Sequence, residues 1–138
     1  MPVKRSKVGY VEQRLEFPCE HATRAVIPSI RAVVARILVN ELGFTKYAAA
    51  KVLDVTPAAI SNYISQKRGE KYVDKIMSDR HLYAIAREIA LMLSKHKGAK
   101  TPEVFMRYKN LVCAICSQVN VYAQMFGCEA NRRGDAGG

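Results

Sequence analysis

Four cysteines are the side chains of this sequence best suited to chemistry. Cys113 and Cys116 are three residues apart and would share one face of a helix, whereas Cys19 and Cys128 lie towards the two ends of the chain. Four thiolates suit either zinc or an iron–sulfur cluster, provided that the N-terminal segment packs against the C-terminal helix. With a single Cys-x-x-Cys pair, the spacing is not that of a zinc ribbon. Free cysteines are often buried as small apolar residues, and spacing alone favours that simpler interpretation.

Signals for catalysis are lacking. The sequence has no Gly-rich phosphate loop, no acid/base pair of carboxylates in a familiar setting and no nucleophile motif. The Cys-x-x-Cys pair lacks the strand–helix context of a thioredoxin-like site. His21 could replace one thiol, but four cysteines suffice, and His81 and His96 fit solvated helix surfaces. We therefore expect a protein that is not an enzyme.

Composition and charge favour a polyanionic partner. The chain has 138 residues, 49% of them apolar, and 22 basic against 12 acidic side chains give a net charge of +10. This excess points to nucleic acid first and to an anionic membrane surface second. No run of eighteen apolar residues and no apolar segment behind the basic start is present, so we expect a cytoplasmic protein without a membrane span. In that compartment we expect the four cysteines to be reduced thiols or metal ligands rather than disulfides, although disulfides do occur inside hyperthermophiles.

The apolar residues recur at helical spacing, which predicts an all-α fold. Ser29 and Gly43 bound a first helix of about 29–42, and Thr45 opens a second that ends near 53. Thr56, followed by proline, opens a third helix that reaches about 66, and another short helical stretch follows around 72–76. Two longer helices are expected after these, one over about 82–97 and one that begins at Thr101 and ends by Gly127.

The second and third helices satisfy the physical needs of a DNA-binding helix-turn-helix. Two helices that cross closely need a small residue, and Ala50 stands where one is required. The turn needs a residue that tolerates positive φ; Asp54 takes the place of the usual glycine, and aspartate does visit this region. Apolar residues follow at the offsets of buried positions: Leu53, Val55, Ile60 and Tyr63 or Ile64.

This segment resembles the Cro/repressor type of helix-turn-helix, and the chain from about 18 to 128 resembles a family of small archaeal transcriptional regulators. The simpler alternative is an alanine-rich pair of core helices without a DNA-binding role. The matching pieces are Pro18-Cys19-Glu20, Pro28-Ser29-Ile30-Arg31, Ala58-Ala59-Ile60-Ser61-Asn62-Tyr63, Lys67-Arg68-Gly69, Ile115-Cys116 in its Cys-x-x-Cys, and Cys128.

The resemblance implies a regulator that binds specific double-stranded DNA as a homodimer. Its third helix would enter the major groove, where Asn62 can pair with adenine, and strong guanine readout is not expected because this helix has no arginine. The residues expected at base edges are Ala58, Ala59, Ser61, Asn62 and Gln66. The residues expected at phosphates are Thr45, Lys46, Thr56, Lys67, Arg68 and Lys71.

The resemblance also raises the expectation of a shared site for Cys19, Cys113, Cys116 and Cys128, with an iron–sulfur cluster preferred to zinc. Such a cluster would let oxidant, nitric oxide or iron supply act on the DNA-binding helix. Structural cysteines (zinc or a disulfide) and a basic RNA-associated protein are the alternatives, although the latter lacks an aromatic stacking surface. We divide the chain into an arm (1–20) with Cys19, the helix-turn-helix domain (21–77), C-terminal helices for dimerisation and the cysteine site (78–128) and a disordered tail (129–138).

Overall fold

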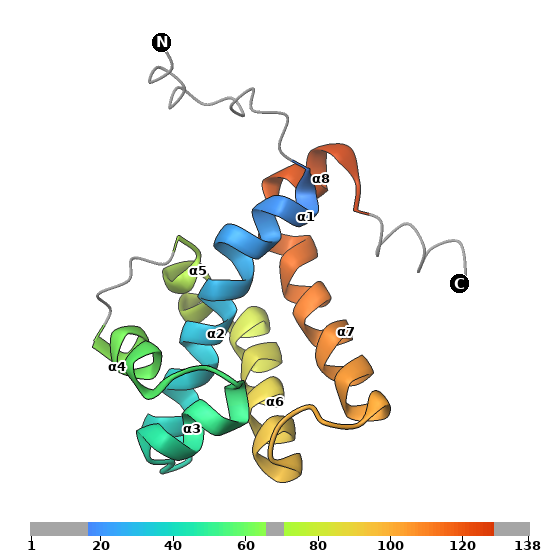
Figure 1. Cartoon of the computed structure of the whole chain (residues 1–138). Coiled ribbons are helices and arrows are strands. Elements are labelled where there is room, and N and C mark those ends of the chain that lie inside the picture. The colour runs from blue at the N-terminus through green and yellow to red at the C-terminus, as the bar shows by residue number, and fades with distance from the viewer. Residues whose placement is uncertain (1–16, 66–70, 129–138) are drawn as a thin grey trace.

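A computed structural model describes residues 17–65 and 71–128 of the chain (Figure 1). All regular elements in these two ranges are helices, and neither range contains a β-strand. The all-α prediction is therefore confirmed for the described residues. None of the described helices is both long enough and apolar enough to cross a membrane.

The first described part of the chain, from Pro18 to Glu41, is one continuous helical path. It comprises α1 (Pro18–His21), the π-helical segment η2 (Ala22–Val26), α2 (Ile27–Arg36) and the π-helical segment η3 (Ile37–Glu41). The side chain of Glu20 closes the first turn by accepting a hydrogen bond from the Phe17 amide at 2.8 Å. A proline inside a regular α-helix lacks an N–H for the helical hydrogen bond and collides with the carbonyl four residues earlier. The π-helical turn of η2 ends at Val26, two residues before Pro28.

The expected start of this helix at Ser29 is wrong. Ser29 is buried inside α2, where its hydroxyl donates to the Ala25 carbonyl at 2.8 Å and accepts from the Tyr72 amide at 3.1 Å. Cys19 consequently lies in the first turn of a helix and not in a preceding loop. The cap-like serine was misleading because its hydroxyl serves a contact with a segment more than forty residues away.

The next elements follow their predicted limits. Helix α3 (Lys46–Leu53) begins after Thr45, whose hydroxyl accepts from the Ala48 amide at 3.0 Å. Helix α4 (Pro57–Ser65) begins after Thr56, which accepts from the Ala59 amide at 3.1 Å. The short helix α5 (Val73–Ser78) follows. Threonine caps are local signals, which is why the sequence located these helix starts correctly.

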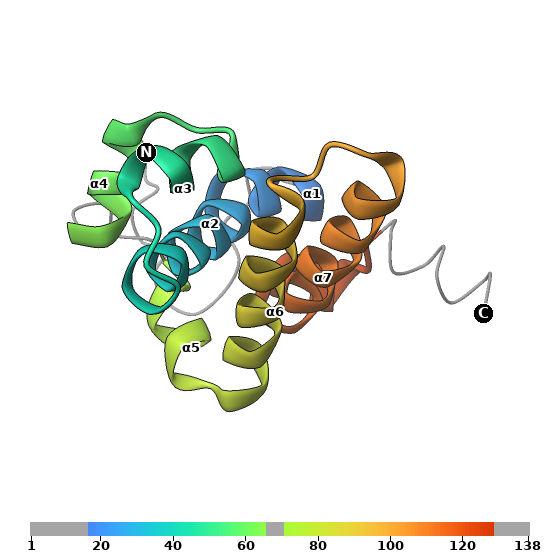
Figure 2. The same ribbon diagram turned by 90° about the horizontal axis from the view of Figure 1, so that it is seen from below.

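The C-terminal part is a pair of long antiparallel helices with a short third one (Figures 1 and 2). Helix α6 (Arg80–His96) is followed by α7 (Pro102–Val119), which starts at the predicted Thr101 cap. The expected continuation of this helix to Gly127 is wrong, because the chain bends at Asn120 and restarts as α8 (Val121–Phe126). The Asn120 side chain accepts from the amides of Tyr122 and Ala123 and so caps the new helix.

One hydrophobic core joins both parts of the chain. Helix α2 lies between α4, α5 and α6, and α7 covers the opposite side of α6. Val33, Leu38, Ile60, Ile89 and Ile115 are completely buried or nearly so, and all belong to a single cluster of packed side chains. Helix α7, which carries Cys113 and Cys116, and the helices α3 and α4 are therefore positioned by the same core.

Candidate nucleic-acid interface and cysteine pocket

A left-handed residue makes the turn between α3 and α4. Asp54 has φ 58° and ψ 47°, and its amide donates to the Lys51 carbonyl at 3.3 Å. The Val55 amide donates to the Ala50 carbonyl at 3.0 Å, which completes the helix end. The aspartate thus adopts the positive-φ conformation that the sequence analysis required at this position.

The packing of the two helices matches the predicted pattern of small and apolar residues. Ala50 is 3% exposed and Ile60 is completely buried, and the two helices pack against each other. Of the two candidates at the end of α4, Tyr63 is buried whereas Ile64 is only partly buried. Arg36 of α2 donates from Nε to the Tyr63 carbonyl at 3.1 Å, which ties the C-terminal end of α4 to the central helix.

Of the residues expected at base edges, Ala59 packs against the core, whereas Ala58, Ser61 and Asn62 lie at fully or partly exposed positions of α4. Ala58 is exposed, and Ala59, Ser61 and Asn62 are half-buried. Within the described residues the Asn62 side-chain amide makes no hydrogen bond, so its donor and acceptor are available to a ligand. Gln66, which was expected to join this set, lies outside the described residues.

The residues expected at phosphates are accessible where the structure describes them. Thr45, Lys46, Thr56 and Lys71 are all exposed, and the two threonines cap the N-termini of α3 and α4. Lys67 and Arg68 lie outside the described residues. Tyr47, which the sequence analysis did not single out, is 75% exposed in the first turn of α3. In the sequence, only its position next to Lys46 could have marked Tyr47 as a candidate for this surface.

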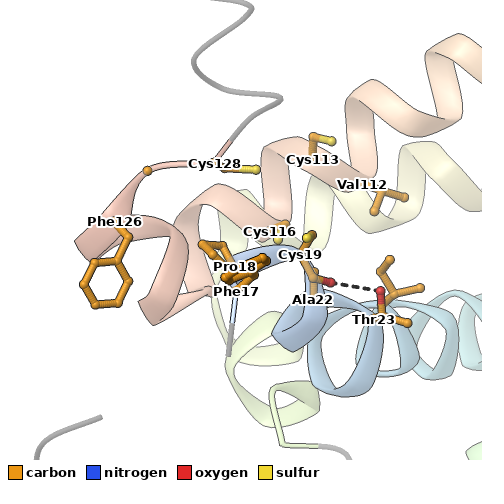
Figure 3. Close-up of a pocket in the computed structure, with 12 residues that line it drawn as sticks. Phe17, Pro18, Cys19, Ala22, Thr23, Val112, Cys113, Cys116, Phe126 and Cys128 are labelled. Carbon is orange, nitrogen blue, oxygen red and sulfur yellow. Dashed lines mark hydrogen bonds between the residues drawn. The ribbon is translucent and has the colours of Figure 1, made fainter. Parts of the chain in front are cut away.

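All four cysteines line one pocket of about 470 Å³ (Figure 3). Cys19 comes from α1, Cys113 and Cys116 from α7, and Cys128 from the segment just after α8. The packing of α1 against α8 and of η2 against α7 brings these distant parts of the chain together. The packing of the N-terminal segment against the C-terminal helices, which was the condition for a shared site, is therefore present, and we call the resulting cavity the cysteine pocket.

Burial controls the protonation of the two helical thiols. It raises the pKa of Cys113 above that of an ordinary thiol, an effect that Lys109 partly offsets and the nearby Cys128 reinforces. Burial likewise raises the pKa of Cys116, against the lowering effect of a hydrogen bond from Asn120. Each thiol in the described part of the chain is free rather than paired in a disulfide. At neutral pH both helical cysteines are thus protonated when no metal is bound.

The donor set of the cysteine pocket fits a thiolate-bound cofactor in number and type. Its walls are mostly apolar, as shown by Phe17, Ile27 and Val112 around the four thiols. In the described conformation, however, no three His, Cys, Asp or Glu side chains among residues 17–65 and 71–128 are placed to hold one metal ion. Cofactor binding would therefore require the thiols to turn towards a common centre in the pocket.

Asn120 is a residue of this site that the sequence analysis missed. It is 1% exposed, and its Nδ2 donates to the Pro18 carbonyl at 3.0 Å and to Cys116 Sγ at 3.3 Å, while its Oδ1 caps α8. One amide thus connects the helix of Cys19, the thiol of Cys116 and the helix that precedes Cys128. In the sequence, only the presence of an asparagine within a helical pattern of apolar residues could have marked Asn120 as special.

Comparison of the chain with protein-family models, with curated proteins and with solved structures gives no match.

Proposed function

We propose that this protein is a sequence-specific double-stranded-DNA-binding transcriptional regulator of the Cro/repressor helix-turn-helix type, and that an iron–sulfur cluster in the cysteine pocket makes it responsive to redox or iron state. The observation that carries the DNA-binding part is the α3–α4 unit. Its left-handed Asp54 turn, its buried Ala50 and the exposed or partly exposed Ala58, Ser61 and Asn62 of α4 are compatible with the needs of such a unit.

In this proposal α4 enters the major groove and α3 lies across the phosphate backbone. Asn62 supplies a donor and an acceptor that match the N6 and N7 edge of adenine, and the methyl group of Ala58 can contact a thymine methyl. Lys46 and Lys71 neutralise phosphates, and the amides at the capped N-termini of α3 and α4 add hydrogen bonds. With about six neutralised phosphates, affinity would fall roughly a thousandfold between 50 and 200 mM salt.

A homodimer would place two α4 helices on adjacent half-sites of DNA. The C-terminal helices offer apolar side chains for the contact, since Leu91 of α6 and Met106 of α7 are 42% and 52% exposed. This contact surface lies outside the α3–α4 unit. Dimerisation and DNA binding would then use different parts of the protein.

The DNA-binding proposal is tested by selecting a preferred duplex from random sequences and comparing two variants on it. Asn62→Ala should lose about tenfold in affinity for that duplex and little for random DNA, because it removes a base contact. Lys46→Ala should weaken binding to both duplexes equally, because it removes a phosphate contact. The slope of log affinity against log salt concentration should become shallower by about one. Asn110→Ala, at an exposed position of α7, is the control. Failure to select any preferred sequence, or equal losses for both variants on both duplexes, would refute the proposal.

The cluster part of the proposal rests on the convergence of four thiols on one pocket. When bound, an iron–sulfur cluster would supply reversible electron transfer and sensitivity to oxidants, and Cys19, Cys113, Cys116 and Cys128 would hold it. Anaerobic purification followed by iron, zinc and sulfide analysis should give iron and sulfide in equal amounts, with a visible absorption that bleaches in air. Cys116→Ser should lose this absorption, whereas Ser117→Ala, on the neighbouring position of α7, should keep it. One zinc per chain, or no metal at all, would instead identify the cysteines as structural.

A further inference from the structure

A second pocket, of about 400 Å³, lies where the α3–α4 turn meets the loop between α6 and α7. It is formed by the end of α3, by Arg31 of α2, by the α6–α7 loop and by the first turns of α7. The loop approaches α3 so closely that a side-chain carbon added at Gly98 would lie 3.4 Å from the Val52 carbonyl oxygen. We call this cavity the basic pocket, and it shares no lining residue with the cysteine pocket.

Positive charge dominates the polar lining of the basic pocket. Arg31, Lys51 and Lys100 contribute three cations, and Asp54 contributes one carboxylate, which leaves an excess of two positive charges. In the described part of the chain none of these three cations takes part in an ion pair. Arg31 is only partly exposed, and an anion in the pocket would offset the excess of positive charge.

The remaining walls of the basic pocket are apolar or aromatic. Leu93 belongs to the core, and the rings of Phe105 and Tyr108 lie 6.2 Å apart at an angle of 59°. Phe105 is 52% exposed, so its ring is accessible to a ligand in the pocket. The volume of the pocket falls in the range of small-molecule sites, which combine apolar walls with a few polar groups.

We propose that the basic pocket binds a small organic anion that carries a planar aromatic ring, with a phosphate or a carboxylate as its charged group. The Arg31 guanidinium can bind either anion through two parallel hydrogen bonds, and Lys51 and Lys100 add charge at the rim. The aromatic ring of the ligand lies against Phe105 and Tyr108. Asp54 opposes the anion, so the site prefers ligands whose charged group lies on the side of Arg31.

This inference does not depend on DNA binding, and its test needs no DNA. Phenyl phosphate is titrated into the full-length protein by calorimetry, with inorganic phosphate and phenol as probes that carry only the anion or only the ring. Phenyl phosphate should bind saturably and at least fivefold more tightly than either probe, because it alone can contact both the cationic side chains and the aromatic rings of the pocket. Binding no tighter than that of inorganic phosphate would overturn the proposal, since the aromatic wall would then contribute nothing.

Substitutions of exposed residues identify the site and avoid unfolding the protein. The double substitution Lys51→Gln and Lys100→Gln should lower the affinity for phenyl phosphate about tenfold. Asp54→Asn should raise this affinity a few-fold, because it removes the opposing charge, and asparagine also tolerates the positive φ of this position. The matched control, Lys75→Gln with Lys109→Gln, removes the same net charge from exposed positions outside the pocket and should change nothing. Equal weakening by both double variants would show general attraction to a basic surface and would refute the site.

Discussion

At the scale of single residues, the protonation of Cys113 and Cys116 decides when the cysteine pocket can accept a metal. Both thiols are half-buried among apolar side chains, and this burial is the largest cause of their raised pKa. A metal binds the thiolate, so binding must release these protons, and affinity for iron or zinc should rise with pH. Asn120 favours the thiolate of Cys116 by donating a hydrogen bond to its sulfur.

The raised pKa values can be measured through the alkylation of thiolates by iodoacetamide. In the metal-free protein, Cys113 and Cys116 should react with midpoints at higher pH than the same residues in the urea-unfolded chain. Mass spectrometry of the labelled peptides follows each site. Lys109→Gln should raise the midpoint of Cys113 further and leave Cys116 unchanged, because Lys109 lowers the pKa of Cys113 alone.

The raised pKa values of the two thiols also determine how folding stability changes with pH. Because the folded protein holds these protons to higher pH than the unfolded chain does, the unfolded chain ionises first as pH rises. Folding stability from the two thiols is therefore complete below the pKa of a free thiol and is lost as pH rises above it towards the raised values. Identical alkylation midpoints in the folded and unfolded chain would contradict both expectations.

At the scale of elements, the turn between α3 and α4 depends on the tolerance of one side chain for positive φ. Asp54 adopts φ 58° and ends α3 without a glycine. Aspartate is among the few residues that visit this region at low cost, whereas a β-branched residue is strained there. The conformation therefore limits which substitutions can preserve the crossing of α3 and α4.

Substitution of Asp54 tests that dependence by chemical denaturation. Asp54→Ile should lower the free energy of unfolding by about 1–2 kcal/mol, because a β-branched side chain is strained at this φ. Asp54→Gly should stay within about 0.5 kcal/mol of the original, since glycine relieves strain but gains freedom in the unfolded chain. Lys51→Ile, at an exposed position of the preceding turn, is the control for the added apolar side chain. If Asp54→Ile were no more harmful than Lys51→Ile, the turn would not depend on this conformation.

At the scale of the whole molecule, one helical path connects the cysteine pocket with the proposed recognition helix. The path begins at Pro18, next to Cys19, and runs through α2 to Arg36, whose guanidinium group holds the Tyr63 carbonyl at the end of α4 (Figure 1). A change in the cysteine pocket that shifts α1 can therefore reach α4 through rigid, packed structure. This connection gives the proposed sensor a physical route to the DNA-binding surface.

Arg36→Gln should interrupt that route. Loss of a charged hydrogen-bond donor to the Tyr63 carbonyl should lower the free energy of unfolding by about 1–2 kcal/mol, measured by urea denaturation. DNA binding by this variant should also differ less between the cluster-loaded and cluster-free protein. Arg87→Gln is the matched control, because Arg87 forms a half-exposed ion pair with Glu41 at 3.0 Å and should contribute less than about 1 kcal/mol. Unchanged coupling in a folded Arg36→Gln protein would exclude this route.

Features that depend on neighbouring residues could be predicted from the amino-acid sequence. The threonine caps at Thr45, Thr56 and Thr101 and the left-handed turn at Asp54 follow from local hydrogen bonding and from backbone sterics, so they could be predicted. The same holds for the apolar faces that became the core, because their spacing is a property of each helix alone.

Features that depend on distant segments became visible only in the folded chain. The hydroxyl of Ser29, inside α2, accepts from the Tyr72 amide, and the side-chain amide of Asn120, at the break between α7 and α8, donates to the Pro18 carbonyl. The convergence of Cys19 with Cys128, and of Arg31 with Lys100, likewise requires contacts across most of the chain. Such contacts form when packing brings remote residues together, and no local pattern encodes which of them will meet. The four thiols could therefore be recognised as candidate ligands from the sequence, whereas their shared pocket emerged from the fold.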